Sequence, residues 1–291
     1  VMNETNKSAV KKAGIDFGLT LVKAYLVRDD GEKVYYSTAD MSREGLAAAL
    51  ANWGVTDLCV AGNGPSHGFE EFRPHRSDHE DPILGELELQ AGGVVQLMTE
   101  AGLKLSDQCM IVSIGTGTSY TLLKGGGEIV QLLGSNIGAG TVDGHMRSWG
   151  YVSGSAAIDK VLAKEFKPFD IKLADVSTKY KDLPDSFVAS SFALVAREWD
   201  GNQTGGPRLV ASAVKQLVTD VVRSIWLHQL NPACGTVEHV VVLGTLPTRS
   251  RVFRRELEKS LVDAGRVPIF LPHGEYALCI GAYYEINPIN P

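Results

Sequence analysis

Two segments of the chain share one order of apolar and polar positions. In residues 14–23 an apolar run meets a turn of Gly and Thr and a second apolar run follows, and residues 111–123 repeat this order. Short apolar runs on both sides of a permissive turn predict a β-hairpin. Such turns expose backbone N–H groups and hydroxyls, which are the groups that bind phosphate. The repeated pattern therefore predicts a nucleotide held by two hairpins.

Beyond the hairpins, the periodicity of apolar residues predicts alternating helices and strands without a low-complexity linker. Residues 167–207 carry no clear pattern. We expect a two-lobed α/β body with a cleft between the lobes, residues 1–105 forming the N-terminal lobe and 106–291 the C-terminal lobe. Strands are expected over 33–38, 58–61, 128–133, 239–244 and 268–271, and helices over 42–53, 83–101, 153–166, 207–230, 250–264 and 275–284.

Charge and hydropathy narrow the class of protein. The 291 residues carry a formal net charge of −6. A negative net charge does not attract nucleic acid or an anionic membrane, so the charge favours neither as a partner. The apolar runs are shorter than the roughly 20 residues that span a bilayer. The first residues are polar and lack the apolar core of a signal peptide, and Val1 is read as a cloning remnant. We therefore expect an enzyme of the cytosol, with no nucleic-acid or membrane partner.

Histidines and cysteines give no strong metal or disulfide signal. The polar segment 65–82 holds His67, His75 and His79, but their spacing does not match a motif such as H-E-x-x-H, so a surface loop is favoured over a metal site. The four cysteines are scattered in apolar contexts without a C-x-x-C pair, which predicts buried, reduced thiols.

Asp16 ends the first predicted strand, beside the turn that would meet phosphate. A carboxylate there repels phosphate unless a divalent cation lies between them, so Asp16 is a candidate Mg²⁺ ligand. A turn-forming aspartate is the alternative. Lys23 follows on the next strand, where it either neutralises phosphate charge or faces solvent.

Phosphoryl transfer to a hydroxyl also needs a base near the acceptor. Glu86 and Glu88 lie on one predicted helix, and two residues along a helix rotate by about 200°, so only one of them can face a cleft. Either glutamate could instead be a solvated helix residue. The chain has no P-loop and no protein-kinase motif, and Gly138-Ala139-Gly140 does not continue into a dinucleotide-binding motif.

Five segments, in order along the chain, resemble the motifs of one family. They are Gly14–Lys23, Gly115–Ser119, Gly138–Thr141, Ala189–Phe192, and His273–Tyr276 with Ile280–Ala282. Over about residues 13 to 285 the chain resembles a type II pantothenate kinase, of the sugar kinase, actin and chaperone ATPase superfamily.

The resemblance implies an actin-like, ribonuclease-H-like ATPase fold with a central cleft between the lobes, and ATP and Mg²⁺ as cofactors. It implies that Glu86 accepts the proton of the pantothenate hydroxyl as that hydroxyl attacks the γ-phosphorus of ATP, the first step of coenzyme A biosynthesis. It also implies a homodimer formed through the helix over 207–230. We assign metal binding to Asp16, substrate contacts to Ser119 and Gln131, and nucleotide binding to Asp16, Gly18, Thr20, Lys23, Gly115, Thr116, Gly117, Thr118, Gly138, Gly140 and Gly244.

Three positions depart from the family pattern. Leu19 and Leu278 stand where the family has glycine, which we expect to add bulk where the nucleotide lies, and Gln131 stands where the family has an arginine that holds the substrate. A missing charged donor can cost roughly 10²–10³ in rate. An active kinase of pantothenate or a related molecule, another kinase of the superfamily, and a non-catalytic paralogue that binds such a ligand all stay open.

Overall fold

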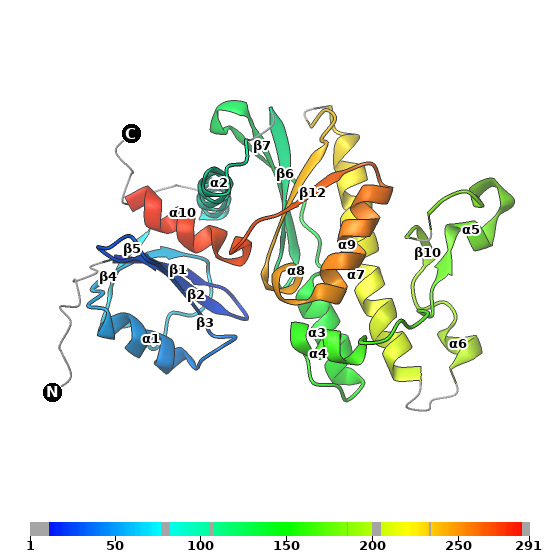
Figure 1. Cartoon of the computed structure of the whole chain (residues 1–291), viewed down its shortest axis with the longest axis horizontal. Coiled ribbons are helices and arrows are strands. Elements are labelled where there is room, and N and C mark those ends of the chain that lie inside the picture. The colour runs from blue at the N-terminus through cyan, green and yellow to red at the C-terminus, as the bar shows by residue number, and fades with distance from the viewer. Residues whose placement is uncertain are drawn as a thin grey trace. The chain divides into compact units, whose positions relative to one another are not determined.

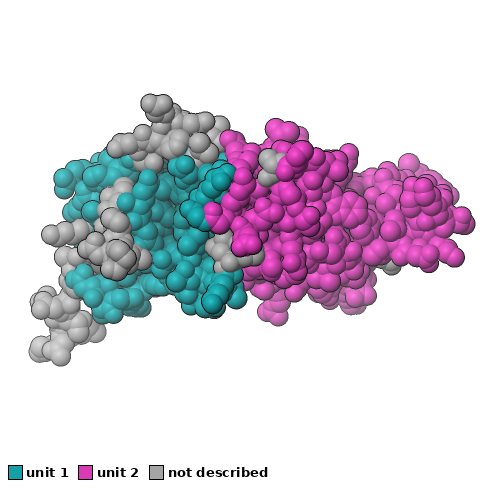
Figure 2. Space-filling model, turned by 90° about the horizontal axis from the view of Figure 1, so that it is seen from above, with its two compact units in different colours: residues 1–105, 126–129, 272–291 teal, residues 106–125, 130–271 magenta. Residues whose placement is uncertain are grey.

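Two five-stranded mixed sheets with the same strand layout carry the fold. The computed structural model describes residues 12–76, 82–104, 107–184, 186–199, 205–232 and 234–286. The chain divides into two units, unit 1 with residues 1–105, 126–129 and 272–291, and unit 2 with residues 106–125 and 130–271 (Figure 2).

The sheet of unit 1 has the strand order β3-β2-β1-β4-β5. The expected hairpin is formed by β1 and β2, which pair antiparallel, whereas β4 and β5 join β1 in parallel. The elements of this unit (Figure 1) are β1 (Lys12–Phe17), β2 (Val22–Val27), β3 (Lys33–Ser37), α1 (Arg43–Asn52), β4 (Asp57–Ala61), β5 (Arg73–Arg76), α2 (Pro82–Glu100), η4 (Gly274–Tyr276) and α10 (Ala277–Ile286).

The second sheet repeats this order as β8-β7-β6-β11-β12. Its hairpin of β6 and β7 is antiparallel, and β11 and β12 join β6 in parallel, so the second expected hairpin is also confirmed. Its strands are β6 (Gln108–Ile114), β7 (Thr118–Lys124), β8 (Ile129–Gln131), which follows η1 (Gly125–Gly127), β11 (His239–Leu243) and β12 (Val267–Phe270). Its remaining elements are α3 (Ala139–Ser148), α4 (Ser155–Val161), β9 (Ile171–Lys172), α5 (Leu173–Val176), η2 (Thr178–Tyr180), β10 (Val188–Ser190), α6 (Val195–Glu198), α7 (Gly206–Gln229), α8 (Thr245–Arg249) and α9 (Arg251–Asp263).

In unit 1 the last helix, α10, packs on α2 and on β1. The backbones approach so closely that a Cβ added to Gly93 would lie 1.8 Å from the carbonyl oxygen of Ala277, and one added to Gly281 would lie 1.7 Å from that of Leu89. Glycine is thus required at both crossing points. The expected division at residue 105 assigned this helix to the C-terminal lobe, whereas its packing is with the first sheet.

In unit 2 the long helix α7 buries one apolar stripe against the sheet. Val210, Val214, Leu217, Val221 and Ile225 recur at helical spacing and are all buried, as their sequence positions predict. On α9, Phe253, Leu257 and Leu261 are buried in the same cluster. The core of this unit therefore follows the helical pattern of the sequence.

Several element boundaries differ from expectation. The helix expected over 153–166 is shorter, and an additional helix, α8, precedes α9. The polar segment 65–82 contains the edge strand β5, whose His75 bonds Asp57 at 2.8 Å, while His79 lies outside the described residues.

The side chains of the four cysteines are free and buried, as expected. Within the described part of the chain, no group of three or more His, Cys, Asp or Glu side chains could hold a metal ion. Of the helices that the structure describes, none is long and apolar enough to cross a membrane.

Candidate functional site

At the end of β1 the hairpin places a buried carboxylate beside a lysine. Asp16 and Lys23 are paired across β1 and β2, and Lys23 Nζ lies 3.7 Å from Asp16 Oδ2. Only 8% of Asp16 is exposed, and this burial raises its pKa, although the positive charge of Lys23 acts in the opposite direction. Lys23 therefore has a partner within the site, which neither of its expected roles included.

The turn between β1 and β2 is open to solvent. Gly18 is half-buried and a Cβ there would lie 2.6 Å from the carbonyl oxygen of Leu21, so the turn requires glycine. Thr20 is exposed. The side chain of Leu19 is 78% exposed, so it adds apolar surface to the rim of the turn and fills none of the core.

Two glycines that follow the neighbouring strand β4 lie against the end of β1. Gly62 has φ +76°, and a Cβ there would lie 2.6 Å from Asp16 Oδ1. Gly64 donates its backbone N–H to the carbonyl oxygen of Phe17 at 2.5 Å. Because β1 and β4 are parallel, both end at the same edge of the sheet. The Gly-Asn-Gly sequence after a buried strand was the available signal for this second side of the site, and sequence reasoning assigned it no role.

The structure separates the two candidate glutamates. Glu86 is half-buried, and its pKa is raised by burial first and by the negative charge of Asp16 second. Asn63, from the loop after β4, donates its side-chain amide to Glu86 Oε2 at 3.5 Å. Glu88 is exposed. The α2 helix therefore presents Glu86, and not Glu88, to the end of β1 where Asp16 lies.

The second hairpin turn, between β6 and β7, is held by hydrogen bonds. Gly115 donates its N–H to the carbonyl oxygen of Gly117 at 2.9 Å. The hydroxyl of Thr118 is buried and donates to the carbonyl oxygen of Ile137 at 2.7 Å. Thr116 is exposed at the tip and Ser119 is half-buried. Of these side chains, Thr116 is the most accessible to a ligand.

The N-terminus of α3 is docked on this turn. Ala139 and Gly140 donate their N–H groups to the carbonyl oxygens of Gly115 and Thr116, at 2.8 and 3.2 Å. A Cβ at Gly138 would lie 2.5 Å from the carbonyl oxygen of Thr116, so the small residues permit this close contact. The N–H groups expected to meet phosphate are therefore engaged by the turn, and the glycines have a packing role that the sequence did not reveal.

Gly244 follows β11 and begins α8. It has φ +116°, and a Cβ there would lie 2.1 Å from the carbonyl oxygen of Ile114, the last residue of β6. Gly244 is thus beside the second hairpin turn. Gln131 ends β8 and is exposed.

The expectation for Leu278 is wrong. Its side chain is 7% exposed and belongs to a core cluster with Cys59, Ala61, Leu89 and Ala282, where α10 packs on α2 and β4. Because the leucine points into the core of unit 1, its extra volume contributes to packing. It does not occupy an open site.

Each unit therefore brings together one set of candidate residues. Unit 1 collects Asp16, Lys23 and Glu86 near the end of β1, and unit 2 collects the second turn, the start of α3 and Gly244 near the end of β6. A buried carboxylate beside a half-buried one suits cation binding and proton acceptance.

Known proteins are similar to this chain over nearly its whole length. No family model matches it. Type II pantothenate kinase of Staphylococcus epidermidis is 25% identical over 280 residues, which is 94% of this chain and 99% of that protein. Type II pantothenate kinase of Staphylococcus aureus is 24% identical over 279 residues, which is 94% of this chain and 98% of that protein.

Two solved structures share the fold at low sequence identity. The activator of 2-hydroxyisocaproyl-CoA dehydratase from Clostridium difficile, with bound ADPNP, has a TM-score of 0.60 and 13% identity over 94% of this chain and 93% of its own. Component A of (R)-2-hydroxyglutaryl-CoA dehydratase from Acidaminococcus fermentans has a TM-score of 0.59 and 16% identity. The match covers 95% of this chain and 97% of that protein. The chain has the two-lobed α/β fold of actin-like ATPases, as the sequence predicted.

Proposed function

We propose that the protein is an ATP-dependent small-molecule kinase that phosphorylates the hydroxyl of pantothenate or a closely related molecule. The observation that carries this proposal is the position of Glu86, half-buried on α2, where burial first and the charge of Asp16 second raise its pKa. The nearly full-length similarity to type II pantothenate kinases supports the substrate class. The bound ADPNP of the dehydratase activator, which shares the fold, supports ATP as the phosphoryl donor.

In this proposal Glu86 is the general base. It accepts the proton of the acceptor hydroxyl through a carboxylate oxygen, while Asn63 orients the carboxylate through its amide. A base works best when its pKa is close to the working pH, and burial shifts the pKa of Glu86 in that direction. Glu88, being exposed, takes no part.

Asp16 is the residue of this chain that would hold Mg²⁺. A buried carboxylate whose ionised form is disfavoured, with a second carboxylate nearby, fits a cation that takes one or two carboxylates together with phosphate oxygens. Bound there, Mg²⁺ would neutralise phosphate charge. Lys23, 3.7 Å from Asp16, would share this task.

We assign the nucleotide phosphates to the two hairpin turns. Gly18 and Thr20 would line the first, and Gly115, Thr116, Gly117 and Thr118 the second. Gly138, Gly140 and Gly244 would support the second turn through close packing. Ser119 and Gln131 would contact the acceptor.

A second function is favoured by one observation at the second turn. The N–H groups of Ala139 and Gly140 already donate to turn carbonyls, and the exposed Gln131 is neutral, so fewer donors are left to stabilise negative charge that develops during transfer. A paralogue that binds nucleotide or a pantothenate-like ligand without turnover fits this arrangement.

We also propose that the kinase works in the cytosol as a homodimer joined through α7. Two exposed leucines at the end of that helix support this, since Leu227 is 53% and Leu230 is 78% exposed. Sedimentation of the wild type and of Leu230→Asp would measure it, and a wild-type monomer would contradict the dimer.

A coupled ADP-release assay with pantothenate, pantetheine and several sugars tests the kinase proposal. We expect turnover with pantothenate or pantetheine that Glu86→Gln lowers by roughly 10²–10⁴, while Glu88→Gln stays close to wild type. Equal losses at both positions would contradict the assignment of the base.

Calorimetry with Mg·ATP, and with ATP plus chelator, separates the two functions. Nucleotide binding without turnover on any acceptor would favour the non-catalytic paralogue. Folded protein that gives no heat in either titration would exclude a nucleotide at the hairpin turns.

A further inference from the structure

A cavity of about 160 Å³ lies in unit 2, where the segment from β9 to β10 meets α7 and α9. Its walls are mainly apolar and come from Leu173, Phe187, Val188, Val222 and Trp226. The rings of Phe187 and Trp226 touch, with centroids 5.2 Å apart, so an aromatic contact joins the segment to α7. A dry cavity of about 150 Å³ is large enough to bind benzene. This cavity therefore has the size and the lining for a short alkyl chain.

Two hydroxyls on the cavity lining are buried without a partner. Thr219 Oγ1, on α7, and Ser260 Oγ, on α9, have no hydrogen-bond partner among the described residues, and Ser260 is only 2% exposed. Hydroxyls within helices commonly donate to the carbonyl of the preceding turn, but these two do not. Because a buried polar group without a partner is costly, a bound molecule that places an oxygen here is stabilised by both hydroxyls.

The edge of the cavity carries one exposed cation. Arg223 is the only lysine or arginine among the lining residues, and it makes no hydrogen bond or ion pair with any residue that the structure describes. A guanidinium without a partner, next to an apolar wall, is suited to a carboxylate.

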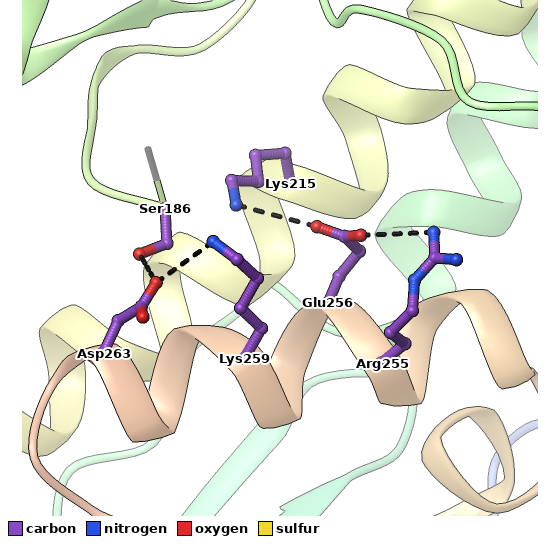
Figure 3. Close-up of polar contacts among 6 residues, drawn as sticks. All are labelled: Ser186, Lys215, Arg255, Glu256, Lys259 and Asp263. Carbon is purple, nitrogen blue, oxygen red and sulfur yellow. Dashed lines mark hydrogen bonds and ion pairs between the residues drawn. The ribbon is translucent and has the colours of Figure 1, made fainter. Parts of the chain in front are cut away.

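The acid that contacts the lining residue Ser186 is already paired (Figure 3). Asp263 accepts a hydrogen bond from Ser186, which lines the cavity, at 2.7 Å, and lies 3.3 Å from Lys259. Further along α9, Glu256 lies 3.8 Å from Lys215 and 3.4 Å from Arg255. The bond of Ser186 to Asp263 joins the β9–β10 segment to α9, and the contact of Lys215 with Glu256 joins α7 to α9. Arg223 is the cation among the lining residues.

We propose that this cavity binds a short aliphatic carboxylate of roughly four to six carbons. The alkyl chain lies between the apolar walls, an oxygen meets Thr219 and Ser260, and the carboxylate pairs with Arg223. All lining residues belong to unit 2 and none is a candidate for phosphoryl transfer. The site is thus independent of the proposed kinase function.

Calorimetry on the full chain with hexanoate, 1-hexanol and hexylamine tests the ligand class. We expect hexanoate to bind with a Kd of roughly 0.01–1 mM and at least tenfold more tightly than the alcohol, with no measurable binding of the amine. Arg223→Gln should remove this preference for the carboxylate, whereas Arg251→Gln, at an exposed arginine outside the cavity, should retain it.

Two variants of the lining separate a binding role from a structural one. Thr219→Val removes one buried hydroxyl at constant shape, so the free protein should melt at a higher temperature while hexanoate binds about tenfold more weakly. Val222→Phe should fill the cavity and abolish binding, with circular dichroism as the check on folding.

Three results would overturn the proposal. The first is no binding of any probe, which would mean that the cavity holds only water. The second is equal binding of hexanoate and 1-hexanol with Arg223→Gln unchanged. The third is a Val222→Phe variant that sediments differently from the wild type but binds hexanoate equally well. This result would mean that a second copy of the chain covers this face.

Discussion

At the scale of single residues, Glu86 combines a stability cost with a proposed function. The pKa of its folded-state carboxyl is raised by burial and by Asp16, so the folded protein holds the proton more tightly than the unfolded chain. Stability therefore falls as pH rises from the ordinary glutamate range through the folded-state pKa, and it stays lower above that window.

Glu86→Gln removes this cost. We expect the variant to be more stable than the wild type at neutral pH by roughly 0.5–2 kcal/mol, with the difference shrinking towards acid pH, while turnover is lost. Urea unfolding at several pH values measures the free energy of unfolding. Glu88→Gln is the control, and a similar gain there would show that local burial of Glu86 is not the cause.

Gln131→Arg tests the substrate side of the proposed site. Gln131 is exposed at the end of β8, so an arginine there is tolerated by the fold and adds a charged donor. If the site is a weakened pantothenate kinase, we expect kcat/KM for pantothenate to rise by roughly tenfold or more. If the site is built for another acceptor, the variant should lose whatever activity exists.

The sequence predicted the division of roles between Glu86 and Glu88 only in part. Helix geometry required that one glutamate face away, and the structure agrees. The contact of Asn63 with Glu86 joins a loop after β4 to α2, and helical spacing contains no information on such long-range pairs. Leu278 was misassigned because a single position in a motif does not show which face of α10 points to the core.

At the scale of elements, two adjacent glycines in α2 have opposite expected effects. Gly93 faces α10, where a Cβ would lie 1.8 Å from the carbonyl oxygen of Ala277, and Gly92 is exposed with nothing within 4 Å of its Cβ position. Gly93→Ala should therefore destabilise by roughly 1–3 kcal/mol or more through overpacking.

Gly92→Ala is the matched control. It should stabilise by roughly 0.5–1 kcal/mol, since alanine is the better helix former. Thermal unfolding of both variants measures the difference. Equal shifts at the two positions would contradict the close crossing of α2 and α10.

Elements with a strong apolar period were predicted well, and irregular ones were not. The stripe on α7 is visible in the sequence because burial on one face sets its period. Between 167 and 199, β9, α5, η2, β10 and α6 are two to four residues long, too short to show a period. The edge strand β5 is polar because most of its side chains are exposed.

At the scale of the molecule, the repeated pattern correctly predicted two hairpins, and the structure shows that each lies in a sheet of the same strand order. The sequence did not reveal that the last helix joins the first unit, because the pairing depends on contacts of Gly14 and Gly93 with residues 277–283, far away in the chain. Nothing in the local pattern of α10 indicates which sheet it covers.

Ending the chain after Pro272 tests this assignment. Without α10, the face of β1 and β4 that includes Cys59 and Ala61 loses its apolar cover. We expect hydrogen exchange to rise by orders of magnitude in β1 and β4 and far less in β6 and β11, whose cover belongs to unit 2. Loss of protection confined to the second sheet would contradict the assignment.

The late position of α10 also has a consequence during translation. The first sheet leaves the ribosome early, but its closing helix is made only at the end, roughly ten to forty seconds later at the usual 5–20 residues per second. For that interval the nascent chain displays an apolar sheet face and the bare crossing glycine of α2. We expect the first half of the chain to be the part that chaperones hold during synthesis, and the second half to fold before it.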